Sequence, residues 1–446
     1  MRTQAARARK RNRLKPMRHD NLYLWLLVDP AAPRYVGKLR LVDAGKGVSL
    51  QYGADWQASG FPLSEDLLLV DIEQLPRWRG VAVGAVDDAR PDRWGERVIQ
   101  YLDKPARLSI MEYLFYAGDD RFGALGVSTS AEAYIPRTTS PLPRLSQAQQ
   151  LSEIVHKVSA REPVNDIERK LLATGGSFGG ANPKALIDIA GEQWIIKFFN
   201  NEPIDVPLIE HASMTLAKLA DITVAATQVV PLVGAHALAV RRYDRQGVKR
   251  IHCISAGTAL RAETFAGQEP QFGYPGLAQL LRRAGVAQDG RNLHDMQELF
   301  RRMVFNILID NTDDHEKNHT LMVVEPTRQG KYRLAPAYDV LTTNSGQGYQ
   351  EFIVGVDQRD STLSNAMSQC ELFGYTPAQA AAVVVRVIQV VDGWRKHFAQ
   401  CGVSVADLDS LAQRIDGDQL LGQRQTFDHK SYATSVRRRR QSPFSR

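Results

Sequence analysis

The chain has 446 residues, of which 43% are apolar and 24% charged, as expected for a globular protein of two or three domains. No apolar run approaches the roughly 18 residues that a membrane-spanning helix requires, and the basic N-terminus lacks the apolar core of a secretory signal. The three cysteines, Cys253, Cys370 and Cys401, are too widely separated for a disulfide framework or a zinc site, so we expect reduced thiols in a cytoplasmic protein.

The net charge of +7 is concentrated at the two ends of the chain. Residues 1–18 contain eight Arg or Lys, residues 436–446 contain five, and neither segment contains an acid. Subtracting these thirteen positive charges from +7 leaves the body at −6. We predict that both tails are disordered and basic, while the body is mildly acidic. Such tails could contact nucleic acid electrostatically, or they could be solvated without a partner.

In chain order, residues 19–134 are predicted to form a β-rich N-terminal subdomain. Apolar runs separated by Pro, Gly and Asp indicate strands at 22–28, 34–42 and 47–53. A helix is predicted over 90–102, "RPDRWGERVIQYL", because Pro91 suits a first-turn position. The segment 135–145 is rich in Pro, Ser and Thr, which predicts a linker and the first domain boundary.

Residues 146–275 begin with a helical pattern and continue with a glycine-rich loop, "TGGSFGGANPK", at 174–184. Two apolar runs follow, "ALIDIA" and "WIIKFF", joined by "GEQ", which predicts a hairpin directly after the loop. A further helix is predicted to begin near Asp205, with Pro207 in its first turn. Two more strand-like runs come after it, "QVVPLV" and "HALAVRRY".

Residues 276–435 are predicted to be mainly helical. The clearest helix covers 293–309, where apolar residues recur at spacings of three and four positions and should form one buried face. These residues are Leu293, Met296, Phe300, Met303 and Ile307. Two strands are predicted beyond this helix, "TLMVV" and "KYRLAP", joined by the turn "EPTRQG". The chain then returns to helical patterns up to the basic tail at 436–446.

A dense polar cluster, "NTDDHEKNH" at 311–319, stands where the apolar helix ends. Asn318 follows Asp313 by five residues, which is the separation between the Asp and the Asn of kinase catalytic loops. In those loops the Asp accepts the proton of the attacking hydroxyl and the Asn binds magnesium. Asp339 follows the predicted hairpin, as does the kinase acid that binds the metal on the nucleotide phosphates. This set predicts phosphoryl transfer.

The upstream loop has the composition of a phosphate site, since glycine lets backbone N–H groups approach phosphates closely. Four glycines occur within six residues, and Lys184 follows them. The loop matches neither the Walker A pattern nor G-x-G-x-x-G, so a plain turn or linker is the alternative interpretation.

Lys197 lies in the middle of an apolar strand and is interpreted as a phosphate-contacting lysine. The alternative is an edge lysine whose ammonium group reaches water. Glu210 on the next helix could pair with Lys197, although an exposed helical glutamate is the ordinary case. His315 is interpreted as a phosphate-contacting or loop-structuring residue, and His319 as a structural one.

Together these segments resemble the HipA-type serine/threonine kinases, the toxin components of bacterial type II toxin–antitoxin pairs. The resemblance covers most of the chain and rests on "GGSFGGANPKALI", "WIIKFF", "ALAVRRYDR", "NTDDHEKNH" and "LAPAYDV", supported by "DDARPDRWGERVI" and "GDDRFGALG" near the N-terminus. It implies an α+β, protein-kinase-like bilobal fold with an N-terminal β-rich subdomain and an all-helical C-terminal lobe. Residues 146–275 would form the nucleotide-binding N-lobe, and residues 276–435 the C-terminal lobe.

The resemblance also implies roles for individual residues. Asp313 would be the catalytic base, and Asn318 and Asp339 the ligands of Mg²⁺. The residues implied to bind ATP are Gly179, Gly180, Ala181, Asn182, Pro183, Lys184, Lys197, Arg241, Tyr243, Asp244, His315, Asn318, Tyr338 and Asp339. Ser177 is the implied autophosphorylation site, where a phosphate of roughly −1.5 to −2 charges would compete with the phosphates of ATP and inactivate the kinase.

Two positions depart from the family pattern. Asn182 stands where Gln or Arg is more frequent, which could change the mobility of the loop. Arg241 replaces an acidic residue, although a backbone contact to adenine would survive that change.

Family members usually pair with a small helix-turn-helix antitoxin that binds operator DNA, and their substrates include aminoacyl-tRNA synthetases. Because the sequence shows no helix-turn-helix pattern and its body is acidic, we expect DNA contact only through such an antitoxin, and no membrane contact. Two other functions stay open at this point. One is a catalytically weak co-repressor that acts with a DNA-binding antitoxin, and the other is a small-molecule phosphotransferase, since the same residues phosphorylate sugars and antibiotics in kinase relatives.

Overall fold

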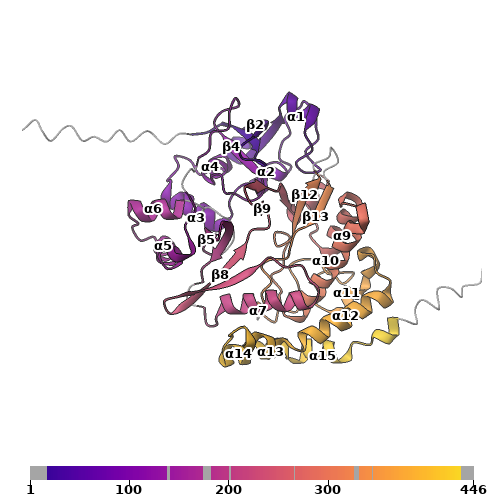
Figure 1. The fold of residues 1–446 in the computed structure, drawn as a ribbon. Coiled ribbons are helices and arrows are strands. Elements are labelled where there is room, and N and C mark those ends of the chain that lie inside the picture. Colours follow the sequence, from indigo (N-terminus) through magenta and orange to yellow (C-terminus); the bar gives the residue numbers. More distant parts are fainter. Residues whose placement is uncertain are drawn as a thin grey trace, which may run out of the picture.

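The described chain contains two four-stranded antiparallel sheets, a three-stranded sheet, a two-stranded ribbon and a helical C-terminal lobe (Figure 1). The structure is a computed structural model that describes residues 18–137, 141–173, 182–199, 202–265, 267–325, 331–343 and 345–432. In Figure 1 the N-terminal sheet lies at the top, the second large sheet in the middle and the C-terminal helices, in yellow, at the bottom.

The N-terminal subdomain is built on an antiparallel sheet in the order β3-β2-β1-β4. Its strands are β1 (Asn21–Leu26), β2 (Arg34–Val42), β3 (Gly47–Tyr52) and β4 (Leu125–Ser128). Its helices are α1 (Ala54–Ser59), α2 (Ala85–Asp88), α3 (Arg93–Leu102) and α4 (Ile110–Tyr116). The three predicted strands and the predicted helix are confirmed. Strand β4 was not predicted, because it is only four residues long and includes a glycine.

The second sheet has the order β5-β6-β8-β7 and carries the predicted hairpin. Its strands are β5 (Lys184–Ile189), β6 (Glu192–Lys197), β7 (Thr227–Leu232) and β8 (Ala235–Arg241). The helices beside it are α5 (Ala148–Ala160), α6 (Asp166–Ala173) and α7 (Val206–Leu219). Helix α7 begins as predicted: Pro207 lies in its first turn, and the side chain of Asp205 caps it by accepting a hydrogen bond from Leu208 N at 3.2 Å.

The two faces of this second sheet belong to different hydrophobic cores. One face packs Ala185 and Ile196 against α5 and against Trp94 of α3, so the N-terminal subdomain contributes to this core. The other face packs Leu238 against α7, within the larger core that continues through the C-terminal lobe. Packing therefore crosses the linker that was predicted at 135–145.

The C-terminal lobe is a helical bundle that also contains the small sheet β11-β12-β13. Its helices are α8 (Ala256–Ala262), α9 (Tyr274–Ala284), α10 (Arg291–Leu308), α11 (Leu363–Ser368), α12 (Pro377–Val391), α13 (Trp394–Gln400), α14 (Val405–Ile415) and α15 (Asp418–Thr426). The strands are β9 (Arg245–Gln246) and β10 (Lys249–Arg250) of the ribbon, then β11 (Cys253–Ser255), β12 (Thr320–Glu325) and β13 (Lys331–Leu334). The lobe is therefore not all-helical, because the predicted hairpin β12–β13 finds an edge partner in β11.

Short 3₁₀ helices complete the described structure at Asp43–Gly45, Leu145–Gln147, Gln288–Gly290 and Cys370–Phe373. Within the described residues, no helix combines the length and the apolar character needed to cross a membrane. The three cysteines are free thiols; Cys253 and Cys370 are buried, and Cys401 is half-buried.

Helix α10 has the apolar face that its periodicity predicts, with one exception. Met296, Phe300, Met303 and Ile307 are all at most 2% exposed. Leu293 is 43% exposed, because the first turn of α10 lies at the surface of the lobe. The prediction that Leu293 is buried is therefore wrong, whereas the rest of the face forms the centre of the core that supports the loop after α10.

This difference gives a matched test of the core. Phe300→Ala removes a fully buried ring and should lower the free energy of unfolding by about 3–5 kcal/mol, because a cavity replaces the lost contacts. Leu293→Ala, on the same helix and the same predicted face, should change it by less than about 1 kcal/mol. Urea unfolding followed by circular dichroism measures both, and equal effects would contradict the arrangement of α10.

Candidate active site

The predicted catalytic loop, 311–319, follows α10 and is held by its own hydrogen bonds. Asn318 N donates to His315 O at 2.9 Å, and Asn318 Nδ2 donates to the backbone oxygen of Asp313 at 3.3 Å. Asn318 is buried, whereas Asp313 is exposed at the surface of the loop. Partial burial of its carboxyl raises the pKa of Asp313, and the charge of His315 offsets part of this rise. A carboxylate with a raised pKa is a stronger proton acceptor.

Asp314 anchors this loop to the core. His319 Nε2 lies 2.8 Å from Asp314 Oδ2, and the hydroxyl of Tyr274 on α9 donates to the same oxygen. The ring of His319 stacks on Phe352 with 5.1 Å between the ring centroids. Burial opposes ionisation of Asp314, but the charge and hydrogen bond of His319 outweigh it and lower the pKa. His319 therefore has the structural role that the sequence predicted.

Lys197, in β6, bonds to two carboxylates. Its Nζ lies 2.6 Å from Glu210 Oε1 on α7 and 2.6 Å from Asp339 Oδ1. Lys197 is 7% exposed, so the alternative of an edge lysine reaching water is wrong. Burial alone would lower the pKa of Lys197, but the two carboxylates outweigh it and raise the pKa. The predicted pairing with Glu210 is confirmed, and the lysine stays charged in a buried place.

Asp339 lies at the end of a segment that pairs with the connection between α7 and β7. Ala225 N donates to Ala337 O at 2.9 Å, which fixes this segment beside the chain between α7 and β7. Asp339 has a left-handed backbone with φ of +60°, a conformation that non-glycine residues adopt mainly at functional sites or turns. Burial opposes its ionisation, but the charges of Lys197 and then Lys184 lower the pKa of Asp339 to about 2.

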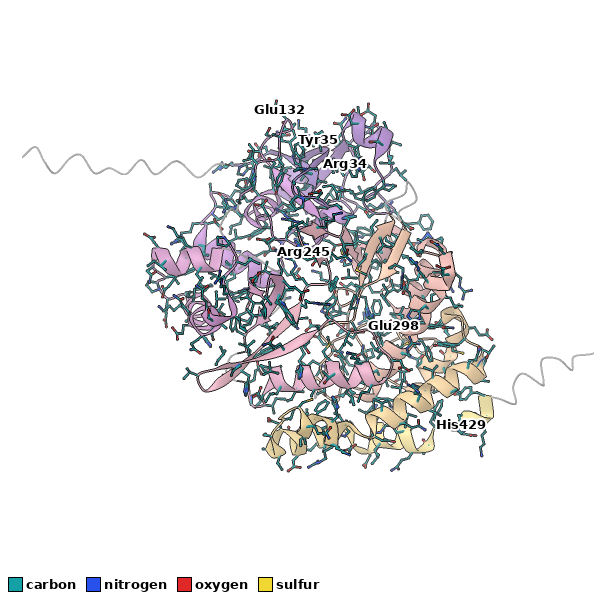
Figure 2. All side chains as sticks on the ribbon, in the orientation of Figure 1. Arg34, Tyr35, Glu132, Arg245, Glu298 and His429 are labelled. Atoms are coloured by element: carbon teal, nitrogen blue, oxygen red, sulfur yellow. The ribbon has the colours of Figure 1, made fainter. Side chains whose placement is uncertain are left out.

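Two residues of α10 that the sequence analysis missed also hold the chain before Asp339. Arg302 Nη2 donates to Ala335 O at 2.7 Å, and Arg302 Nε donates to Glu298 Oε1 at 3.0 Å. Glu298 Oε2 accepts a hydrogen bond from Thr223 Oγ1 at 2.9 Å, and Figure 2 shows Glu298 on the α10 side of this region. The spacing of four residues between Glu298 and Arg302 was visible in the sequence, but many solvent-exposed helical pairs share it.

The two halves of the predicted site lie together. Lys197 bonds to Asp339, and the hydroxyl of Tyr338, the residue before Asp339, donates to the backbone oxygen of Lys317 in the predicted catalytic loop at 2.6 Å. The upstream lysine, the acid after the hairpin and the loop at 311–319 therefore lie close together.

The predicted phosphate loop is described only at its end. Lys184 begins β5 and is 8% exposed, and its burial, followed by the charge of Lys197, lowers its pKa. Asn182 is exposed and Pro183 is half-buried. The other predicted positions lie outside the described residues: Ser177, Gly179, Gly180 and Ala181.

The family resemblance implies that the backbone around Arg241 and Tyr243, at the end of β8, meets adenine. The side chain of Arg241 is exposed and pairs with Glu192, with 3.3 Å between Nη1 and Oε1. The hydroxyl of Tyr243 donates to Thr320 Oγ1 at 2.9 Å, and its ring stacks on Tyr338 with 5.4 Å between the centroids. The two tyrosines therefore join the segment after β8 to the segment after β13.

Asp244 lies in a buried ion cluster at the junction with the N-terminal subdomain. Its Oδ2 accepts hydrogen bonds from Arg242 Nη2 at 2.8 Å, Arg245 Nη1 at 2.9 Å and Gly123 N at 2.8 Å. Both arginines also donate to Arg121 O, and Figure 2 shows Arg245 at this junction. The arginines lower the pKa of Asp244 in spite of its burial. The structure therefore places Asp244 as an anchor between the two parts of the chain.

The donor set around Asp339 fits a magnesium ion that is shared with a nucleotide. Among the described residues, no cluster of three or more His, Cys, Asp or Glu side chains could hold a metal by itself. Mg²⁺ characteristically binds one or two carboxylates and completes its shell with water and substrate phosphates. Asp339, 44% exposed and ionised at neutral pH, and Asn318, with an amide oxygen, are ligands of this kind.

Comparisons with known proteins identify relatives of this chain. Residues 176–394 match the family model of the HipA-like C-terminal domain. The chain is 33% identical over 166 residues to the protein named "Putative kinase Y4dM" of Sinorhizobium fredii, an alignment that spans 34% of this chain and only 38% of that protein. It is 23% identical over 357 residues to the serine/threonine-protein kinase toxin HipA of Shewanella oneidensis, covering 71% of this chain and 75% of that protein.

The fold also matches a solved structure. A chain in the complex of the Shewanella oneidensis toxin–antitoxin system HipA, HipB and its operator DNA superposes with a TM-score of 0.62 at 18% sequence identity. The match covers 94% of this chain and 99% of that chain. At this identity the likeness bears on the fold alone, and it confirms the predicted α+β, kinase-like architecture.

The ion cluster of Asp244 provides a test of the junction. Asp244→Asn leaves two buried guanidinium groups without their carboxylate and should lower the free energy of unfolding by about 3–5 kcal/mol. Glu192→Gln breaks an ion pair whose two side chains are about half exposed and should change it by less than about 1 kcal/mol. Chemical unfolding of both variants measures these values, and an Asp244→Asn protein as stable as Glu192→Gln would refute the anchoring role.

Proposed function

Because the chain is a HipA-type protein, we propose that it is an ATP- and Mg²⁺-dependent protein kinase that phosphorylates serine or threonine residues. The observation that carries the proposal is the buried Lys197, bonded to Glu210 and Asp339 beside the loop that contains Asp313 and Asn318. Two relatives in sequence are named as kinases, and one of them as a serine/threonine-protein kinase toxin.

In the proposed reaction, the acceptor hydroxyl oxygen bonds to the γ-phosphorus, the bond from that phosphorus to the β–γ bridging oxygen breaks, and ADP leaves. Asp313 accepts the proton of the hydroxyl, and its raised pKa makes it a better base for that step. Lys197 binds phosphate oxygens in place of Asp339, while Glu210 keeps the ammonium group oriented.

The metal site of the proposed enzyme uses Asp339 and Asn318. Bound Mg²⁺ neutralises the charge that builds up on the phosphates during transfer. Asp339 can act as a metal ligand because its lowered pKa keeps the carboxylate ionised, and because its side chain is partly open to solvent. Asn318 can serve because the hydrogen bond from its Nδ2 to Asp313 O uses the amide nitrogen and leaves the amide oxygen to act as ligand.

The proposal includes the other nucleotide contacts that the family resemblance implies. The phosphate loop, Gly179 to Lys184, would bind phosphates through its backbone, and His315 and Tyr338 would line the same site. The backbone at Arg241 and Tyr243 would meet adenine, with Asp244 fixing that segment from behind.

Autophosphorylation of Ser177 is proposed as the means by which the enzyme inactivates itself. A phosphate there would bring roughly −1.5 to −2 charges to the loop that receives the phosphates of ATP, so ATP binding would be lost. Phosphopeptide mapping of the protein after incubation with ATP identifies the modified residue.

The proposed partner is a small helix-turn-helix antitoxin, through which the kinase would reach operator DNA in the cytoplasm. The fold match to a HipA chain that is complexed with HipB and operator DNA supports this part of the proposal. The protein substrate would be a cellular protein, and an aminoacyl-tRNA synthetase is the class that the resemblance implies.

The proposed activity is tested with purified protein, ATP and Mg²⁺, followed by intact-mass spectrometry and by labelling of proteins in a lysate. The wild type should gain phosphate or transfer it, and Asp313→Ala should transfer at least about 100-fold more slowly, because the base is lost. Asp55→Ala, an exposed aspartate of α1, is the matched control and should transfer normally.

Absence of phosphate transfer by the wild type would refute the kinase proposal. Nucleotide binding without transfer would favour the co-repressor, and phosphorylation of an aminoglycoside in place of protein would favour the small-molecule phosphotransferase.

A further inference from the structure

The C-terminal lobe contains a hollow of about 290 Å³ that the proposed reaction does not use. It lies between the first half of α10, the hairpin β12–β13 and the connection between α7 and β7 (Figure 1). None of its lining residues was predicted to bind ATP or Mg²⁺. Its volume is close to the lower limit of about 300 Å³ for small-molecule sites.

The hollow has one polar wall and one apolar wall. The polar wall is a single face of α10, since its residues recur at spacings of three and four positions: Arg291, His294, Asp295 and Glu298. The apolar wall comes from the hairpin β12–β13 and the chain just after it: Met322, Val324, Leu334 and Pro336. Val324 remains 39% exposed although it belongs to a strand. A ligand that fits both walls has a polar end and an apolar body.

The two acids of the polar wall are already neutralised. Asp295 Oδ2 accepts hydrogen bonds from Arg333 Nε at 2.7 Å and from Leu334 N at 3.0 Å, and its Oδ1 accepts one from Arg333 Nη2 at 3.0 Å. Glu298 is bonded in the same way to Arg302. Two acids and two arginines cancel, so the charge of Arg291 is left over on this wall.

Arg291 and His294 stand at the outer side of the hollow with weak partners. Arg291 Nη2 lies 3.6 Å from Asp289 Oδ2, and His294 Nε2 lies 3.9 Å from Glu298 Oε2, both longer than a hydrogen bond. The side chains of Arg291 and His294 are 42% and 59% exposed. The first turn of α10 contains no acid, and the helix dipole adds partial positive charge there. The polar end of the ligand should therefore be an anion.

We propose that this hollow is an effector site for a small organic anion, a carboxylate carried by an apolar body. The carboxylate binds the guanidinium group of Arg291, which is a bidentate donor suited to that shape. The apolar body packs against Met322 and Val324 of β12.

The lining residues also hold the chain that leads to Asp339. Thr223 O accepts a hydrogen bond from Ala337 N at 2.8 Å, and Pro336 lies three positions before Asp339. A ligand against Thr223 and Pro336 stabilises this segment where it now lies, with Asp339 bonded to Lys197. The proposed metal site requires Asp339 to leave Lys197, so the ligand should oppose binding of nucleotide and Mg²⁺. This effect rests on the proposed function, whereas the site itself does not.

The site is tested with 2-naphthoate, a carboxylate on an apolar ring system, and with 2-naphthamide as its uncharged counterpart. Calorimetry should show that the wild type binds naphthoate at least about tenfold more tightly, because one charge-assisted contact is gained. Arg291→Gln should remove this preference. Arg395→Gln is the matched control, because Arg395 is similarly exposed and also paired with an aspartate, and it should keep the preference.

Methionine methyl signals locate the bound probe. In protein labelled with ¹³C at the methionine methyl groups, naphthoate should shift the signal of Met322, which is assigned by its loss in Met322→Leu. The signal of Met303, which is fully buried in the core of the lobe, should not move.

The effector role is tested by the affinity for AMP-PNP with Mg²⁺ at rising concentrations of naphthoate. The affinity should fall about threefold or more and then level off, as linkage between two separate sites requires. Arg291→Gln should abolish this fall.

Equal binding of naphthoate and naphthamide, or a naphthoate complex in which Met322 does not shift, would overturn the proposed site. A nucleotide affinity that stays within about twofold would overturn the effector role, and so would a fall that never levels off, because that indicates competition for one site. None of these measurements needs phosphoryl transfer. A protein that binds naphthoate at Arg291 and Met322 but transfers no phosphate would therefore refute the proposed function alone.

Discussion

The buried ammonium group of Lys197 is the constraint on which the rest of the site depends. Removing a charged group from water costs several kcal/mol, and only paired and hydrogen-bonded ions tolerate it. Lys197 meets this requirement with two carboxylates, Glu210 from α7 and Asp339 from the segment after β13. The three residues come from the second sheet, its helix and the C-terminal lobe, so one ion cluster fixes the relative positions of all three elements.

The surrounding contacts can be understood as support for this cluster. Asp205 caps α7 and sets where the helix begins, five residues before Glu210. Arg302 and Glu298 of α10 hold the backbone that leads to Asp339. The same helix ends at Leu308, shortly before the predicted catalytic loop, so the core of the C-terminal lobe positions Asp339 and Asp313 together.

Two different sets of ionic contacts join the N-terminal subdomain to the rest of the chain. The ion cluster around Asp244 is buried and specific in geometry, which suits an anchor that does not move. The pair of Asp92 and Lys317 is partly exposed and therefore contributes little to stability. Helix α3 carries the second contact and also packs Trp94 into the core of the second sheet.

The sequence predicted those features that short-range patterns determine. The periodicity of α10, the hairpin that contains Lys197, and the spacing of Asp313 and Asn318 are local, and each is found in the structure. The partners of these residues were harder to predict, because they are distant in the chain. Asp92 and Lys317 are 225 positions apart, and no local pattern relates them.

Burial was equally hard to predict from the sequence. Leu293 fits the apolar face of α10 by spacing but lies at the surface, since periodicity does not show where a helix leaves the core. The family resemblance implied a nucleotide contact for Asp244, and only the fold reveals that its carboxylate is buried between the guanidinium groups of Arg242 and Arg245. Glu298 was not singled out from the sequence, because its spacing to Arg302 is common on exposed helices, and it is 4% exposed.

A crystal structure of the protein with AMP-PNP and Mg²⁺ tests the central claim most directly. The account predicts that Lys197 keeps its bond to Glu210 and binds phosphate oxygens, while Asp339 leaves Lys197 and coordinates the metal together with Asn318. A nucleotide bound elsewhere on the protein, or bound at this place with the Lys197–Asp339 pair intact, would contradict the account.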